Sequence, residues 1–218
     1  MQEAQIHMQN NNWDSAKIYA VHVLAEADEL SDISMAQTII SLAKDHLEDN
    51  NFELEKQRRI LFDAMLKRFD LIEEINWYYD PLTASYTNQE SMHLYIGKKK
   101  QDYWLRFRVQ YAGNFPLSIL GYTVFTDKNQ YTFSPNGEVK KGQDERKYWE
   151  WFDQRYDPQL HEMVEDVLFS KRAELVLIGK GVNHKRLIST KEKIAMRRIL
   201  RAYEMTPRFN GYEQTYDP

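Results

Sequence analysis

Cysteine is absent from this 218-residue chain, and its absence excludes several kinds of chemistry at once. Without a thiol, the chain can form no disulfide, cysteine nucleophile, zinc ribbon or iron–sulfur cluster of its own. Long apolar runs are missing too, because no stretch approaches the ~20 residues of a membrane-spanning helix. The first thirty residues are polar and amphipathic, and they lack the apolar segment of a secretory signal.

Other signatures of catalysis and metal binding are also missing. Gly179-Lys180-Gly181 lacks the Walker spacing of a phosphate-binding loop, and no Gly-x-Ser-x-Gly elbow is present. The histidines are scattered, without the paired spacing of a metal site. They are His7, His22, His46, His93, His161 and His184. The sequence therefore predicts no metal, no cofactor and no catalytic residue.

Charge is present but unevenly distributed. The net charge is −4, yet the segment from Lys180 to Arg201 carries +7, which leaves −11 for the rest of the chain. Such asymmetry indicates either an anionic partner or a basic helix that docks onto its own acidic domain.

Residues 1–70 are predicted to form helices with short connections. Asn12-Trp13-Asp14 separates two short helical runs, and apolar residues recur at three- and four-residue steps in the second. Residues 12–16 are similar to the helix start of tetratricopeptide-type repeats. Ser31 is expected to cap a third helix, and Asn50-Asn51 to separate it from a fourth that continues to Phe69. Because a solenoid needs three or more repeats, helical hairpins are favoured over a repeat array.

The apolar period changes to two after Asp70, which predicts antiparallel strands. The clearest strand spans Tyr103 to Tyr111, and its odd-numbered residues are expected in a core. The opposite side is predicted to be a cationic outer face. It consists of Trp104, Arg106, Arg108 and Gln110.

Further strands and turns are expected on both sides of this segment. Residues 75–79, 92–97 and 130–133 alternate in the same way, and 117–125 is apolar on both faces, as expected of a central strand. Tight turns are predicted at 127–129 and 135–137.

The C-terminal third is predicted to contain two helices and a strand. Asp157 followed by Pro158 indicates a helix start, and Ser189 with Glu192 forms a capping box for a final helix. A strand is expected over 173–179. The sequence thus predicts an α+β fold, in which N-terminal helical hairpins (1–70) precede an antiparallel β-sheet domain closed by two helices (71–205) and a flexible tail (206–218).

A family resemblance is carried by short segments that follow one another in a characteristic order. They are residues 94–99, 105–111, 148–153, 170–171, 178–180 and 189–193. Together they resemble an uncharacterised bacterial domain found at the C-terminus of envelope lipoproteins, behind a helical or repeat-like segment. The resemblance covers about Ile72 to Glu204 and implies a fold and no catalytic residues.

The resemblance also implies a location. It places the protein in the cell envelope, in the periplasm or on the surface, with a lipid anchor that this chain does not contain. If Met1 is the true start, the protein is expected in the cytoplasm instead.

The first candidate site is the strand face of Trp104, Arg106 and Arg108, which could bind a protein or glycan or could simply discourage edge-to-edge aggregation. Trp149 and Trp151 would extend this site if they are exposed, since the two share one strand face.

Glu150 falls on the opposite face of that strand. It belongs to a group of nearby acids that includes Asp144, Glu145, Asp153 and Asp157. These acids leave hydrolysis of an envelope glycan, through Glu150, Asp153 or a neighbouring carboxylate, as an alternative.

The second candidate site is a basic ridge on the final helix, formed by Lys193, Arg197 and Arg201. It could meet phosphates in a cytosolic nucleic-acid-binding or regulatory protein. The isoelectric point of about 5.9 and the lack of a recognition motif disfavour a nucleic acid. The sequence therefore favours a non-enzymatic binding or scaffold module of the bacterial cell envelope with a protein or glycan partner.

Overall fold

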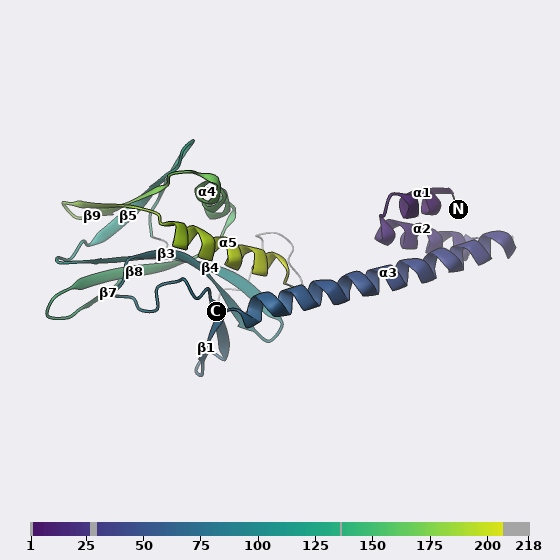
Figure 1. Cartoon of the computed structure of the whole chain (residues 1–218), viewed down its shortest axis with the longest axis horizontal. Helices are drawn as coiled ribbons and strands as arrows, with labels where there is room; N and C mark the ends of the chain where they lie inside the picture. The colour runs from purple at the N-terminus through teal and green to yellow at the C-terminus, as the bar shows by residue number, and fades with distance from the viewer. Residues whose placement is uncertain (1, 27–29, 136, 207–218) are drawn as a thin grey trace. The chain divides into compact units, whose positions relative to one another are not determined.

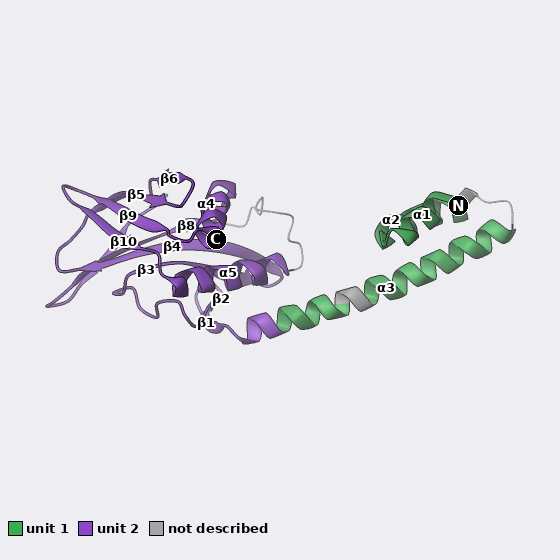
Figure 2. Ribbon diagram, turned by 45° about the horizontal axis from the view of Figure 1, so that its top comes forward, with its two compact units in different colours: residues 1–59 green, residues 60–218 purple. Residues whose placement is uncertain are grey.

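A computed structural model of the chain describes residues 2–26, 30–135 and 137–206, without the side chains of residues 25, 26, 30 and 49–51. The chain divides into two compact units, residues 1–59 and 60–218 (Figure 2). The boundary lies within a helix, whereas the sequence predicts a boundary near residue 70. Residue 136 of the predicted turn at 135–137 and residues 207–218 of the predicted tail lie outside the described residues.

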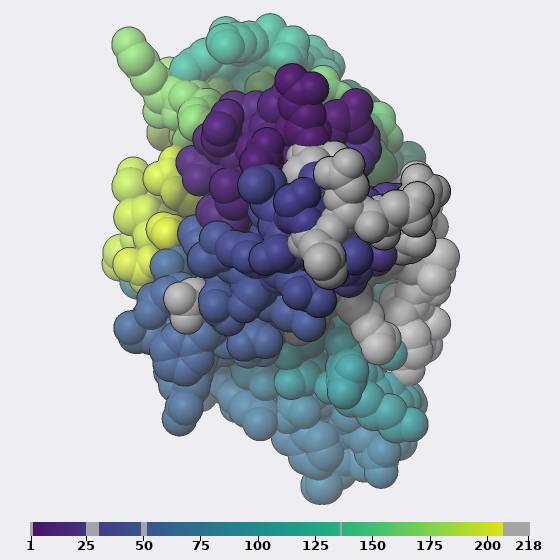
Figure 3. Space-filling view, turned by 90° about the vertical axis from the view of Figure 1, so that its right-hand side faces the viewer, coloured from purple at the N-terminus to yellow at the C-terminus, as the bar shows by residue number. Residues whose placement is uncertain are grey.

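The first unit consists of helices α1 (Gln2–Gln9), α2 (Trp13–Glu26) and most of α3 (Leu30–Asp63). Small side chains fill its core, which allows the helices to approach closely. The core residues are Ala4, Ala16, Ala20, Ala36 and Ile39. In the space-filling view the purple atoms of α1 and α2 lie directly against the blue atoms of α3 (Figure 3). The predicted helical N-terminal part is confirmed.

The helix boundaries differ from those expected. Ser31 lies within α3, and α3 continues through Asn50-Asn51, because an Asn costs a helix less than about 1 kcal/mol. The helix ends at Asp63, and the next segment is strand β1 (Leu66–Asp70), which the sequence predicts as helix. Pairing of β1 with the following strand overrides the helical spacing of its apolar residues.

The second unit contains two antiparallel sheets, where the sequence predicts one. Sheet A, a half-barrel, has the order β1-β2-β3-β4-β8-β7. Its further strands are β2 (Ile75–Tyr79), β3 (Ser91–Lys99), β4 (Asp102–Gly113), β8 (Tyr148–Arg155) and β7 (Lys140–Gln143). Sheet B has the order β10-β9-β5-β6. Its strands are β10 (Asn183–Leu187), β9 (Glu174–Gly179), β5 (Ile119–Phe125) and β6 (Gln130–Phe133).

Helices α4 (Pro158–Phe169) and α5 (Thr190–Glu204) complete the second unit, and the α+β prediction is confirmed (Figure 1). One core joins the two helices to sheet B and to one face of sheet A. The odd-numbered residues of β4 lie in this core, as predicted. They are Tyr103, Leu105, Phe107, Val109 and Tyr111.

Local signals place the remaining elements. Asp157 caps α4 by accepting a hydrogen bond from the amide of Leu160, and Ser189 forms the predicted capping box with Glu192. Strand β5 is central in sheet B, as expected. However, Leu120 is 60% exposed, so the face of β5 that carries Leu120 is not fully covered. With one face of sheet A in the core, its other face is left to form a site.

Candidate functional site

The face of sheet A that points away from the core carries polar and aromatic side chains from all six of its strands. Antiparallel partners at directly opposed positions point to the same side of a sheet. Arg108 of β4 lies opposite His93 of β3 on one side and Asp153 of β8 on the other. Tyr95 and Arg155 both lie opposite Arg106 in the same way. Strand pairing thus gathers residues far apart in the sequence onto one face.

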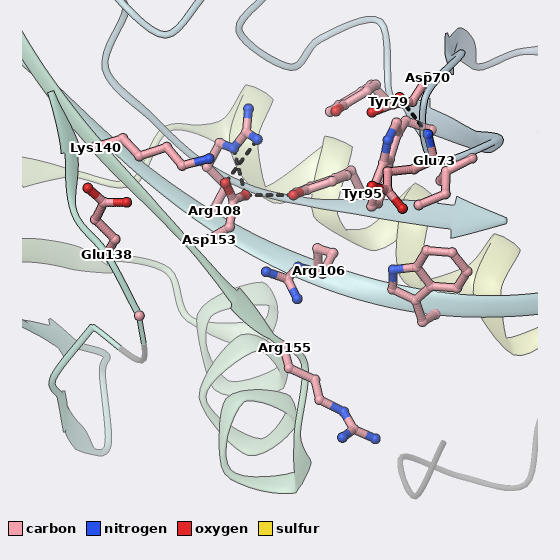
Figure 4. A pocket seen from close by; sticks show the side chains of 14 residues that line it. Asp70, Glu73, Tyr79, Tyr95, Arg106, Arg108, Glu138, Lys140, Asp153 and Arg155 are labelled. Atoms are coloured by element: carbon pink, nitrogen blue, oxygen red, sulfur yellow. Dashed lines mark hydrogen bonds and ion pairs between the residues drawn. The ribbon is translucent and has the colours of Figure 1, made fainter. Parts of the chain in front are cut away.

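This face holds an open pocket of about 660 Å³ (Figure 4). The volume lies within the range of small-molecule sites. The aromatic residues that line it are Trp77, Tyr79, Tyr95 and Trp104. The cationic residues are Arg106, Arg108, Lys140 and Arg155. The acids are Asp70, Glu73, Glu138 and Asp153. The site thus combines ring surfaces with groups of both charges.

The aromatic rings form a continuous cluster on β2, β3 and β4. Trp77 meets Trp104 edge to face at 5.6 Å between ring centroids, and it also contacts Tyr95 at 5.4 Å. Tyr79 stacks on Tyr95 at 5.0 Å. Trp104 lies over the backbone of Gly97, its cross-strand partner, where a Cβ would collide with the indole. Pairing of β3 with β4 thus holds the Trp104 indole in position.

An ion pair at the centre of the pocket joins β4 to β8. Arg108 donates from Nε to Oδ1 of Asp153 at 2.7 Å and from Nη2 to Oδ2 at 3.0 Å. The hydroxyl of Tyr95 donates to the same carboxylate at 2.6 Å. Burial raises the pKa of the Tyr95 hydroxyl, and the Asp153 carboxylate raises it further. Tyr95 therefore stays neutral and keeps donating its proton to Asp153.

The Arg108 guanidinium stays charged despite its partial burial. Burial alone would lower its pKa, but the hydrogen bond and the negative charge of the Asp153 carboxylate raise the pKa. The guanidinium also lies over the Tyr95 ring at 5.1 Å. Both ions of the pair are therefore held by contacts within the protein.

A buried histidine lies beside this ion pair. The Nδ1 atom of His93 is 2.8 Å from the Ser91 hydroxyl, and its ring is near those of Tyr79 and Tyr95. Burial lowers the pKa of His93 to about 3, and the Arg108 charge contributes in the same direction. His93 is therefore neutral at physiological pH and supports the site from below the surface.

The remaining charges occupy different sides of the pocket. Arg106, Lys140 and Arg155 come from β4, β7 and β8, whereas Asp70 and Glu73 come from the β1–β2 hairpin. Asp70 accepts hydrogen bonds from the amides of Ile72 and Glu73, which fixes the hairpin turn. The aromatic cluster separates the hairpin acids from the cationic strands.

The structure changes the interpretation of the predicted face of β4. Trp104, Arg106 and Arg108 do come together and line the pocket. The expectation of an outer, solvent-facing surface is wrong for two residues, because Trp104 is 4% exposed and Gln110 is 1% exposed. Gln110 donates to the backbone carbonyls of Tyr86 and Gln89 and so anchors the β2–β3 loop.

The predicted tryptophan pair lies outside the pocket. Trp149 and Trp151 are half-buried on the pocket face of β8, but neither is among the pocket-lining residues. Trp149 covers Gly142 of β7 as Trp104 covers Gly97, so it has a role in strand pairing. The two tryptophans share one face, as predicted.

Glu150 points from β8 into the core, opposite to Asp153. It is 1% exposed, and its carboxylate accepts hydrogen bonds from the amides of Ser118 (2.7 Å) and Ile119 (2.8 Å). These contacts fix the start of β5, where Ser118 has a positive φ of 54°. Glu150 thus joins sheet A to sheet B.

The basic ridge of α5 is largely engaged with its neighbour α4. Lys193 donates to the carbonyl of Ser170 at 2.7 Å, and Arg197 donates to that of Leu168 at 3.0 Å. Cations at a helix C-terminus satisfy its last carbonyls and oppose the helix dipole. Arg201 is exposed. Two of the three ridge residues therefore connect the helices of the domain.

Several residues of the site escaped sequence reasoning. Alternation puts Trp77 and Tyr79 on one strand face, and Asp153 and Arg155 on the face of Trp151, but it does not show which strands are neighbours. Only the pairing of β4 with β8 places Asp153 beside Arg108, 45 positions away in the chain.

Comparisons with family models, curated proteins and solved structures found no match to this chain. Among the described residues, no group of three or more potential ligand side chains could hold a metal ion. No helix in the described part of the chain is long and apolar enough to span a membrane.

Proposed function

We propose that the protein is a non-enzymatic binding module that holds a glycan in the pocket of sheet A. The resemblance noted in the sequence makes the bacterial cell envelope the proposed location. The observation that carries the proposal is the aromatic cluster in a single pocket, where the half-buried rings of Trp77 and Tyr79 face the ligand, the buried Tyr95 and Trp104 support them, and charged groups surround them.

A sugar combines apolar C–H faces with hydroxyl groups around its edge. Flat rings provide apolar contact area at low conformational cost, and ionised side chains form the stronger hydrogen bonds to hydroxyls. The pocket supplies both kinds of contact within about 660 Å³, and its hollow shape suits a small ligand better than a flat protein surface. These features favour a glycan over a protein partner.

The acids of β8 do not form a catalytic pair. Glycoside hydrolysis needs two carboxyl groups that flank one bond at roughly 5 to 9 Å. Glu150 lies in the core with both oxygens occupied by backbone amides, whereas Asp153 lies on the opposite face of the same strand. In addition, the Asp153 carboxylate is held by Arg108 and Tyr95. This arrangement supports binding without hydrolysis.

The ridge on α5 also offers little for a nucleic acid. Lys193 and Arg197 already bind carbonyls of α4. Phosphate contact by this face would require several free cations along one surface.

The test is glycan binding by a matched pair of tryptophan variants. Trp77→Leu removes a ring from the pocket, and Trp151→Leu removes a half-buried ring from the same sheet face outside the pocket. Glycans from the bacterial envelope should bind with equal affinity to the full chain and to Trp151→Leu. Their affinity for Trp77→Leu should be about tenfold lower. Equal affinity of both folded variants, or no glycan binding by the full chain, would overturn the proposal.

A further inference from the structure

A groove of about 450 Å³ lies between α4 and α5 and shares no residue with the sheet A pocket. Hydrogen bonds from Lys193 and Arg197 to carbonyls at the end of α4 hold the two helices side by side. The lining residues recur at three- and four-residue steps, so they belong to one face of each helix. They are Glu165, Leu168 and Phe169 of α4, with Arg197, Leu200, Arg201, Glu204 and Met205 at or just beyond α5.

The α4–α5 groove combines an apolar hollow with a projecting aromatic ring. Leu168 and Leu200 form its buried floor, and Met205 is half-buried beside them. Phe169, the last residue of α4, also lines the groove but is 84% exposed. An exposed apolar surface of this kind marks a place that another protein can cover. Because the ring and the hollow belong to one surface, two copies of that surface can fit each other, as a two-fold interface requires.

The charges of the α4–α5 groove are also arranged in a self-complementary way. Arg197 lies at the C-terminal end of α4, where it donates to a backbone carbonyl, and Arg201 follows one turn later on α5. Glu165 and Glu204 lie together at the other end, because partial burial raises the pKa of Glu204 and the charge of Glu165 raises it further. His161 lies 3.6 Å from Glu165, but burial lowers the pKa of its ring, so His161 does not balance this acid at neutral pH.

We infer that the α4–α5 groove is the interface of a two-fold dimer, in which Phe169 of each copy enters the groove of the other. A two-fold axis across the groove places its cationic part against the acidic end of the second copy. An axis along the groove would instead bring like charges together, which is unfavourable. Arg201 is exposed and forms no ion pair within the described part of the chain, so it can pair with Glu204 of the partner subunit.

The size of the α4–α5 groove indicates a weak dimer. Few residues line it, and interfaces below about 1,200 Å² of total buried area are typical of transient complexes. Association should therefore depend on protein concentration.

Analytical ultracentrifugation of the full chain tests the interface. The mean mass should rise from one chain toward two between low micromolar and submillimolar concentration. Phe169→Ser should weaken the association about tenfold or more, because a large aromatic side chain that fills a pocket of the partner carries much of the binding energy. Phe52→Ser, which removes an exposed phenylalanine of α3 outside the groove, should leave the association unchanged.

Two charge reversals test the orientation of the copies. Arg201→Glu places acids opposite acids, and Glu204→Lys places cations opposite cations, so each variant alone should remain monomeric where the parent protein dimerises. An equimolar mixture of the two variants should form a heterodimer, because both contacts across the axis then join opposite charges. A role of these residues within a single chain would not produce association on mixing.

The outcomes are distinct. A mass of one chain at every concentration overturns the inference, and so does association that Phe169→Ser leaves unchanged. Two reversed variants that stay monomeric after mixing also overturn it, whereas recovery of association only in the mixture supports it.

Discussion

Arg108 and Asp153 lie opposite each other on β4 and β8 and form a two-point ion pair at 2.7 and 3.0 Å. About 80% of each side chain is removed from solvent. The Tyr95 hydroxyl is bound to the same carboxylate. This group connects three strands of sheet A at the centre of the pocket, so its first role is to hold the site in shape.

Removal of Asp153 should destabilise the protein strongly. Asp153→Ala leaves the Arg108 guanidinium partly buried without its counter-ion, and about 2–3 kcal/mol of unfolding free energy should be lost. Chemical denaturation measures this loss. The double variant Arg108→Met/Asp153→Leu removes both charges and should recover more than half of it, because no buried ion is left unpaired. A double variant less stable than Asp153→Ala would contradict this explanation.

Glu150 is expected to matter for folding and not for ligand binding. Glu150→Ala leaves the amides of Ser118 and Ile119 without their buried acceptor, which should cost about 2–4 kcal/mol. Glu138→Ala, which removes an exposed acid from the pocket, should change stability by less than about 0.5 kcal/mol. If Glu150→Ala unfolds at the same denaturant concentration as the parent protein, the structural role of Glu150 is refuted.

The buried His93 should make the unfolding free energy of the protein vary with pH in the mildly acidic range. Its pKa is about 3 in the folded protein and 6.5 in the unfolded chain, so the unfolded state binds more protons between these values. Unfolding free energy should therefore fall by up to about 1.4 kcal/mol per pH unit as the pH decreases below 6.5. His93→Gln should show a shallower slope from pH 6.5 to 5, where carboxylates contribute little. Identical slopes for the two proteins would show that His93 titrates normally.

The cations of α5 should stabilise α4 rather than bind nucleic acid. Lys193→Met and Arg197→Met should each lower the unfolding free energy by about 1 kcal/mol, because carbonyls at the end of α4 lose their donors. Arg201→Met is the matched control and should stay within about 0.5 kcal/mol of the parent protein. Retention of the parent protein on DNA at low salt, lost in all three variants, would instead favour the nucleic-acid alternative.

Local patterns predicted much of the second unit because strand periodicity and helix caps act over a few residues. The alternation in β4 identified its core face, and Asp157 and Ser189 marked the starts of α4 and α5. The same local rules failed at β1, where apolar spacing predicts a helix and cross-strand pairing with β2 produces a strand.

The site was only partly predictable, because it depends on strand order. Trp104, Arg106 and Arg108 were identified from one strand, but their exposure could not be inferred without knowing what covers them. Trp104 is buried by its contacts with Trp77 and Gly97, which come from two other strands. Periodicity predicts which side a residue faces, and the long-range pairing decides whether that side is solvent, core or pocket.

The most direct test of glycan binding in the sheet A pocket uses the indole N–H resonances of the five tryptophans. Each is assigned by substitution and followed by NMR during titration with the bacterial envelope glycan that binds most tightly. The indole signals of Trp77 and Trp104 should shift with added ligand, while those of Trp13, Trp149 and Trp151 should stay in place. Saturable binding that leaves the Trp77 and Trp104 signals unmoved would contradict a ligand site in this pocket.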